Sequence, residues 1–269
     1  MKLGSWLGGA LLGSAGLLVY GALVESKKLT LEKMAIGLPK WPSHLNGYRI
    51  ALLADFHLCD AASCELAWES IDMALREEPD MVCIAGDFVS YWKDESEDML
   101  LSSLDLLRVM NGNAVAIPGN HEYVAGTPDR LAPVLKELNV TFLRNDSWNH
   151  DNITWVGVDS ANASQADPLG ALISVSGDLP IITLWHEPDR VDCLPPVSAL
   201  MLSGHSHGGQ FCAPWGWAPM TSKNGNRYRR GFFPDAPTPL YVSRGIGTTG
   251  PPSRLFCTPE VTILDLISV

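Results

Sequence analysis

One stretch of the chain decides its fold: Tyr48-Arg49-Ile50-Ala51-Leu52-Leu53-Ala54-Asp55-Phe56-His57. The part before Asp55 is a short, almost continuous apolar run, which is typical of a strand buried on both faces of a sheet. Further strands of this kind are predicted over 81–85 and 114–117, and amphipathic helices between them over 66–78 and 99–110. Alternating strands and helices predict a parallel sheet with helices packed against it.

The pattern changes after one more helix. Thr127 can cap that helix and Pro128 stands in its first turn, and the apolar residues that follow have helical spacing. Beyond residue 139 the sequence predicts mainly strands, over 140–143, 153–158, 181–185, 199–202, 240–242 and 261–266. The whole predicts an α/β fold of two packed β-sheets with helices outside, occupying residues 47–269.

Composition sets the limits on function. The chain has 269 residues, of which 46% are hydrophobic, enough for one large domain or two small ones. Its 19 basic and 30 acidic residues give a formal net charge of −11, which argues against non-specific binding to nucleic acid or anionic lipid. The six cysteines form no C-x-x-C pair and are expected to be free thiols in a reducing compartment.

The N-terminal region is expected to contact a membrane. Residues 3–24 contain no charge and are long enough to span a bilayer. A cleaved signal peptide is the alternative, although a basic start and a small-residue cleavage site are not evident. We therefore expect an anchor over 1–25 and a polar linker over 26–46. Lysines after the anchor favour a membrane crossed once, with the rest of the chain in the cytoplasm.

Polar side chains follow the predicted strands in a consistent way. Five strands are followed by His, Asp or Asn, and the carboxyl ends of strands in an open α/β sheet are where ligands bind. Each residue alone is an ordinary turn or core residue, but together they form a metal-ligand set of imidazole, carboxylate and amide oxygen. The candidates exceed the positions around one ion and fit two ions that share a carboxylate. They are Asp55, His57, Asp87, Asn120, His186, His205 and His207.

The ordered motifs resemble those of calcineurin-like metallophosphoesterases. The resemblance rests on Asp55-x-His57, Gly86-Asp87, Gly119-Asn120-His121-Glu122, His186 and Gly204-His205-x-His207. Gly204–Gln210 and the segment 243–247 are similar to a bacterial membrane-associated branch that includes a UDP-2,3-diacylglucosamine diphosphatase. The resemblance implies a four-layer sandwich of two mixed sheets and flanking helices.

The resemblance also implies a role for each site residue. One metal ion would be bound by Asp55, His57, Asp87 and His207, and the other by Asp87, Asn120, His186 and His205. Asp87 would bridge the ions, while His121 would face the scissile phosphate and protonate the leaving group. A metal-activated hydroxide would then hydrolyse a phosphodiester or diphosphate bond. Manganese is the first expectation for the metal, with iron, zinc and magnesium as alternatives.

Substrate recognition is less determined. A basic loop with Arg227, Arg229 and Arg230 is either a solvated loop or a contact for an anionic head group. We expect a membrane-borne nucleotide-lipid such as UDP-2,3-diacylglucosamine, with soluble nucleotides as the alternative substrates and nucleic acid excluded. Gly204–Gly208 also matches the G-x-S-x-G motif of serine hydrolases, which makes Ser206 a remote alternative nucleophile. A metal-binding scaffold without turnover is a third class, and the oligomeric state is left open.

Overall fold

The computed structural model describes residues 16–173, 175 and 177–269. Its first sheet, sheet 1, has six strands. In spatial order they are β1 (Thr30–Leu38), β12 (Glu260–Ser268), β2 (Tyr48–Leu53), β3 (Met81–Ile84), β4 (Ala114–Ala116) and β5 (Thr141–Phe142). The strands from β2 to β5 run parallel, whereas β12 is antiparallel to β2 and parallel to β1. Sheet 1 is therefore mixed.

Sheet 2 also has six strands. In spatial order they are β10 (Gly231–Phe233), β11 (Leu240–Val242), β9 (Leu200–Ser203), β8 (Ile181–Trp185), β7 (Ile153–Val158) and β6 (Asp146–His150). The four central strands are parallel, and each edge strand is antiparallel to its neighbour.

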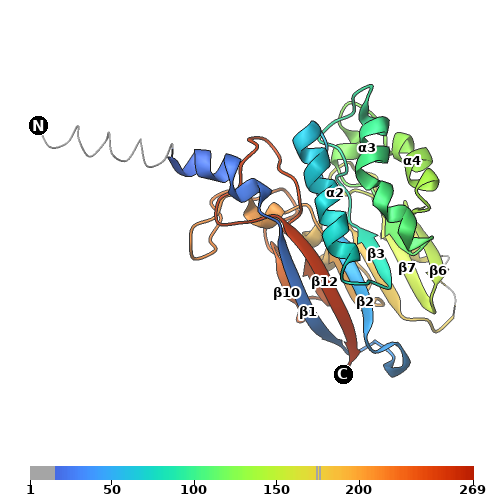
Figure 1. The fold of residues 1–269 in the computed structure, drawn as a ribbon. Helices are drawn as coiled ribbons and strands as arrows, with labels where there is room; N and C mark the ends of the chain where they lie inside the picture. The colour runs from blue at the N-terminus through green and yellow to red at the C-terminus, as the bar shows by residue number, and fades with distance from the viewer. Residues whose placement is uncertain (1–15, 174, 176) are drawn as a thin grey trace, which may run out of the picture.

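The helices cover the outer faces of the two sheets. Figure 1 shows α2, α3 and α4 together against sheet 1. The helices are α2 (Ala61–Leu75), α3 (Ser96–Leu104), α4 (Leu131–Glu137) and α5 (Pro168–Ile173). Single 3₁₀ segments are η1 (Glu25–Lys27), η2 (Ser43–Leu45), η3 (Asp105–Met110), η4 (His121–Tyr123), η5 (Pro128–Arg130), η6 (Pro188–Cys193) and η7 (His207–Gly209).

Strand β2 shows how the layers are built. Ile50 and Leu52 belong to the core between the two sheets, together with Trp155 of β7 and Leu184 of β8. The alternate residues of β2 instead face the core beneath α2, α3 and α4. Both faces of this strand are buried, which explains its continuous apolar run. The predicted architecture of two packed mixed sheets with flanking helices is confirmed.

Several local predictions were wrong. The segment 26–46, expected to be a linker, contains β1, which pairs along its whole length with β12 and so belongs to the folded domain. The helix predicted over 66–78 spans Ala61–Leu75, because Asp60 and Ser63 form a reciprocal capping box at its start. The helix predicted over 99–110 becomes 3₁₀ after Leu104.

The N-terminal anchor predicted over residues 3–24 falls mostly outside the described residues. Residues 16–23 are helical and lead into η1. Within residues 16–173, 175 and 177–269, no helix has the length and apolar character needed to cross a bilayer.

Candidate metal centre

The structure brings the predicted Asp and His ligands together at the carboxyl ends of strands from both sheets. Three groups of side chains place their ligand atoms within 4.8 Å of one another. They are Asp55, His57 and His207; Asp87, His186 and His205; and His57, Asp87 and His121. Asp87 belongs to two groups of different composition, as a carboxylate between two ions would. His121, expected to face phosphate, lies within reach of the same centre.

The backbone at these ligands adopts an uncommon conformation. Asp55, His57, Asp87, His205 and His207 all have positive φ, between 49° and 69°. Non-glycine residues rarely adopt this left-handed region, and such residues cluster at functional sites where the surrounding fold holds them. Because each strand turns sharply at its end, consecutive side chains can point into the same space.

Two glycines let the loops approach one another. Gly86 has a φ of 91°, and a Cβ there would lie 2.6 Å from the amide nitrogen of Gly119. A Cβ on Gly119 would lie 2.2 Å from Oδ1 of Asp87. The Gly-Asp and Gly-Asn-His motifs therefore place glycine where the loops after β3 and β4 touch.

Hydrogen bonds fix the ring orientation of two histidines. Nδ1 of His186 donates to the carbonyl of Ala85 at 2.6 Å, and Nε2 of His205 donates to the carbonyl of Lys223 at 2.7 Å. In its neutral form each ring then has a lone pair on its other nitrogen. Those nitrogens face each other at 3.2 Å, and Nε2 of His186 lies 3.1 Å from Oδ2 of Asp87. Burial disfavours the charged ring of His186, but Asp87 and Asp55 hold its pKa well above the usual range, so in the metal-free protein a proton lies where these three groups converge. A metal ion would take the place of that proton.

The second half of the centre has the same character. Nε2 of His57 and Nε2 of His207 are 3.0 Å apart, with Asp55 Oδ1 at 3.6 Å from His207 and Asp87 Oδ2 at 3.5 Å from His57. Among the described residues, Asn120 Oδ1 is buried without a hydrogen-bond partner. An orphaned amide oxygen beside converging imidazoles fits the donor set of divalent transition metals.

Burial shapes the protonation of these groups in the metal-free protein. Burial lowers the pKa of His57 to about 3, so its ring is neutral, as a metal ligand must be. Burial also raises the pKa of Asp55 to about 7, against the attraction of His186. For Asp87, burial favours the neutral carboxyl, but His186 and His57 hold its pKa well below the usual range. Divalent cations would offset the cost of burying these carboxylates.

Glu122 holds the loops that carry the ligands. It is fully buried, and its carboxylate accepts four backbone N–H groups. Those of Asp87 and Gly119 bind Oε2, and those of Phe88 and Val89 bind Oε1. One side chain thus fixes the loop after β3 to the loop after β4. The sequence analysis included Glu122 in a motif but gave it no role.

A second buried carboxylate, that of Glu187, holds the loop that follows β7 of sheet 2. Glu187 accepts the Ser160 hydroxyl at 2.6 Å and the Asn162 N–H at 2.9 Å. The Asn162 amide then donates to the Lys223 carbonyl at 3.1 Å, the same oxygen that orients His205. The sequence analysis missed both Glu187 and Asn162, because neither residue belongs to a recognisable motif. Outer-shell groups of this kind orient metal ligands.

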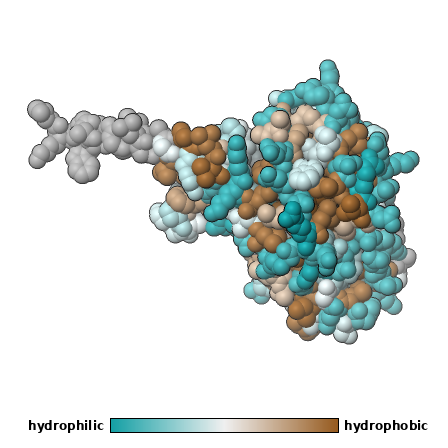
Figure 2. All heavy atoms as spheres, viewed as in Figure 1, coloured by the Kyte–Doolittle hydropathy of each residue, from teal (hydrophilic) through white to brown (hydrophobic). Residues whose placement is uncertain are grey.

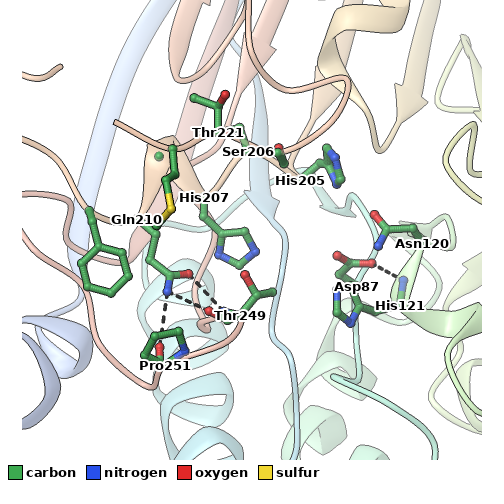
Figure 3. Close-up of a pocket in the computed structure, with 14 residues that line it drawn as sticks. Asp87, Asn120, His121, His205, Ser206, His207, Gln210, Thr221, Thr249 and Pro251 are labelled. Atoms are coloured by element: carbon green, nitrogen blue, oxygen red, sulfur yellow. Dashed lines mark hydrogen bonds between the residues drawn. The ribbon is translucent and has the colours of Figure 1, made fainter. Parts of the chain in front are cut away.

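The metal centre opens into a cavity of about 380 Å³ (Figure 3). Asp87, Asn120 and His121 lie on one side of it and His207 on the other. Nδ1 of His121 donates to the carbonyl of Ser90 at 2.7 Å, which leaves Nε2 available to a bound substrate. Apolar side chains of Phe211 and Met220 also line the cavity. His121 therefore combines an oriented ring with access to the cavity.

The geometry also bears on two other predictions, Ser206 as a nucleophile and the basic loop as a substrate contact. Ser206 donates its hydroxyl to the carbonyl of Arg229, and a single 3₁₀ turn follows it where a nucleophile elbow needs an α-helix. Of the described residues that line the cavity, none is Arg227, Arg229 or Arg230. Arg227 instead pairs with Asp192 at 2.7 Å and is largely exposed.

The family model described as calcineurin-like phosphoesterase matches residues 48–215, which contain every predicted metal ligand. The chain belongs to the calcineurin-like phosphoesterase family. It is accordingly a metal-dependent phosphoester hydrolase.

Individual relatives of this phosphoesterase extend over most of its length. It is 29% identical to Phosphodiesterase YaeI of Escherichia coli over 232 residues, 82% of each protein. It is 27% identical to UDP-2,3-diacylglucosamine pyrophosphatase LpxG of Chlamydia muridarum, covering 91% of this chain and 92% of that protein. A dimetal phosphatase structure from Danio rerio has a TM-score of 0.48 and 12% identity, covering 78% of this chain and 91% of that one.

Proposed function

We propose that this phosphoesterase hydrolyses the diphosphate bond of a membrane-borne nucleotide-lipid of the UDP-2,3-diacylglucosamine type. The proposal rests on the convergence of ligand atoms from His186, His205 and Asp87 beside an open cavity. The relative LpxG, which carries the name of such a pyrophosphatase, supports the substrate class.

The donor set fits two divalent ions, with manganese as the first expectation and iron, zinc or magnesium as alternatives. Asp55, His57, Asp87 and His207 would hold one ion. Asp87, Asn120, His186 and His205 would hold the other. When bound, such ions neutralise phosphoryl charge and lower the pKa of coordinated water.

The residues of the chain supply orientation and a proton. Glu122 fixes the loops that carry Asp87 and Asn120, so the phosphate-facing groups are positioned before substrate arrives. Nε2 of His121 faces the cavity while the Ser90 carbonyl holds Nδ1–H. A protonated His121 donates from Nε2 to the leaving oxygen as the bond to phosphorus breaks.

Replacement of His121 tests this assignment. His121→Ala is expected to keep both metal ions and to lose about 10²–10⁴-fold in kcat, the usual contribution of a general acid. Metal content by elemental analysis and kcat on bis(p-nitrophenyl) phosphate are the two measurements. Loss of one metal ion from the variant would make His121 a ligand instead.

Product analysis tests the substrate class. The full-length protein, loaded with Mn²⁺, is incubated with UDP-2,3-diacylglucosamine in detergent micelles and separately with soluble nucleotide diesters. Release of UMP and lipid 1-phosphate at a higher kcat/KM than the soluble esters supports the proposal. The name of the relative YaeI, a phosphodiesterase, favours the second candidate, a general phosphodiesterase, and the reverse preference would establish it.

The basic loop is proposed to contact the anionic head group. Thr221 and Ser222 at its start line the cavity, and the Lys223 carbonyl orients His205. Arg229 and Arg230 follow within the same loop. Substituting both by Ala is expected to raise KM for the nucleotide-lipid and to leave kcat on bis(p-nitrophenyl) phosphate unchanged. An unchanged KM for the lipid substrate would remove the loop from the site.

Residues 3–24 are proposed to anchor the enzyme to a bacterial inner membrane, with the catalytic domain in the cytoplasm. The uncharged run and the exposed Leu17, Leu18 and Val19 support the proposal. Cys193 is exposed and offers a topology probe. In spheroplasts, an impermeant maleimide should label Cys193 only after lysis, and labelling of intact cells would place the domain outside.

A further inference from the structure

Large apolar side chains are exposed at the end of the molecule that carries the N-terminal helix. Trp215 is 79% exposed, Met220 68% and Leu23 65%. Figure 2 shows apolar side chains at the surface where the described chain begins. We call the following set the apolar rim: Leu17, Leu18, Val19, Tyr20, Leu23, Val24, Trp215, Trp217, Met220 and Phe256. Exposed apolar surface of this extent marks an interaction site.

The segments of the apolar rim are bound to one another. The Arg254 N–H donates to the Gly21 carbonyl at 3.2 Å, and the Ser253 hydroxyl donates to the Leu18 carbonyl at 3.4 Å. Gly21 has no space for a side chain, because a Cβ would lie 2.4 Å from the Arg254 carbonyl oxygen. The Cys212 N–H donates to the Leu255 carbonyl at 2.8 Å. Helix 16–23, segment 250–256 and the loop after Cys212 therefore form one surface.

The apolar rim borders the openings of the metal site. The main cavity is lined by Met220 from the rim and by Phe211 and Pro251 beside it. A second cavity of about 120 Å³ is lined by His57 and by Gly247, Thr248 and Pro252. Its walls include Ala22 of the N-terminal helix, and Ser26 and Lys27, which follow that helix. Whatever covers the rim therefore lies beside the openings that lead to the metal centre.

Charge indicates the kind of partner. In a chain with net charge −11, exposed Lys27, Lys28 and Lys223 stand beside the rim. Tryptophans next to lysines are typical of surfaces that enter the interface of an anionic bilayer.

We propose that the apolar rim docks on an anionic phospholipid bilayer and places the metal-site cavity at the level of the lipid head groups. Residues 17–24 of the rim also belong to the proposed anchor over 3–24, so the contact that this proposal adds is the one made by Trp215, Trp217, Met220 and Phe256. Docking presupposes the proposed function and extends it, because a membrane-borne diphosphate could reach the metal centre without leaving the bilayer.

Tryptophan quenching tests the docking itself. The full-length, Mn²⁺-loaded protein carries Trp6→Phe to remove the N-terminal fluorophore and is mixed with phosphatidylethanolamine–phosphatidylglycerol vesicles that have dibrominated acyl chains. The further change Trp215→Phe/Trp217→Phe should abolish most of the quenching. Trp68→Phe is the matched control, because Trp68 is 43% exposed on α2 outside the rim and its removal should preserve the quenching. Equal quenching with and without Trp215 and Trp217 would overturn the proposal.

Kinetics separate this proposal from the substrate assignment. Trp215→Ser/Trp217→Ser should lower kcat/KM on nucleotide-lipid in vesicles at least about tenfold. Its rate on bis(p-nitrophenyl) phosphate should stay that of the wild type, which shows that the metal site is folded. Quenching of Trp215 and Trp217 without cleavage of the nucleotide-lipid would refute the substrate assignment and support docking. Cleavage in vesicles that is unaffected by the substitutions would refute docking and support the substrate.

Discussion

Replacing Glu122 by Gln changes the carboxylate that holds the ligand loops and alters little else. Each carboxylate oxygen accepts two backbone N–H groups, four in all. Gln keeps one oxygen and places an NH₂ group where the other stood, so two buried N–H groups face a donor. At about 1–3 kcal/mol for each unsatisfied group, the loss is at most roughly 2–6 kcal/mol of the free energy of unfolding, because the neutral Gln also removes the cost of burying an ionised carboxylate beside Asp87.

The assay is urea unfolding of the metal-free protein, measured above the pKa of Glu122, which burial and Asp87 raise to about 7. Under that condition the wild-type carboxylate is ionised and can accept all four N–H groups. Metal titration by calorimetry is the second readout, because shifted loops should weaken metal affinity about 10–100-fold.

Glu97→Gln is the matched control. The carboxylate of Glu97 binds Arg130 at 2.6 and 2.7 Å, but the pair is about one-third exposed. Its loss should cost about 1 kcal/mol or less and leave metal affinity unchanged. If Glu122→Gln were no more destabilising than Glu97→Gln and bound metal normally, Glu122 would not be the group that fixes the loops.

Three further outcomes are expected. Gly86→Ala should destabilise the protein more than Gly112→Ala in thermal unfolding, since both have positive φ but only at Gly86 would a Cβ meet described atoms within 4 Å. Equal effects would show that conformational strain alone decides. Asn162→Ala should weaken metal binding about tenfold in calorimetry. The variant removes the amide that holds the Lys223 carbonyl, and this carbonyl orients the ring of His205. An unchanged affinity would contradict this role. Chelation with EDTA should abolish activity and lower the melting temperature by several degrees, since ligand at about 100-fold above its Kd stabilises by about 2.7 kcal/mol. Mn²⁺ should restore both, and EDTA-resistant activity would refute the metal mechanism.

The central strands were predictable because burial on both faces leaves a continuous apolar run, as in Met81–Ile84. The missed strands lie at sheet edges. Thr30–Leu38 contains Glu32 and Lys33, and Asp146–His150 is almost entirely polar, so neither carries a buried-strand pattern. Their pairing depends on neighbours that are distant in sequence.

The ligands of the site could be predicted for the same reason as the strands that carry them. A polar residue directly after an apolar run, as Asp55 follows Ala54, is visible in one dimension. The supporting groups are not. Glu187 and Asn162 act through backbone atoms of segments that meet only in three dimensions. The positive φ values of the ligands are likewise a consequence of the assembled sheet ends.

The position of β12 between β1 and β2 has a consequence for the order of assembly during synthesis. A ribosome releases β1 early, yet Thr30 pairs with Glu260, and Ala51 of β2 pairs with Ile263 of the same late strand. Strands β2 to β5 and their covering helices can form a nascent subdomain, while β1 has to wait for its neighbour. Until translation reaches β12, the edge of β2 is open to incorrect pairing with other chains. We therefore expect the nascent protein to be a client for chaperones that shield strand edges, and its folding rate to be limited by the insertion of this one strand.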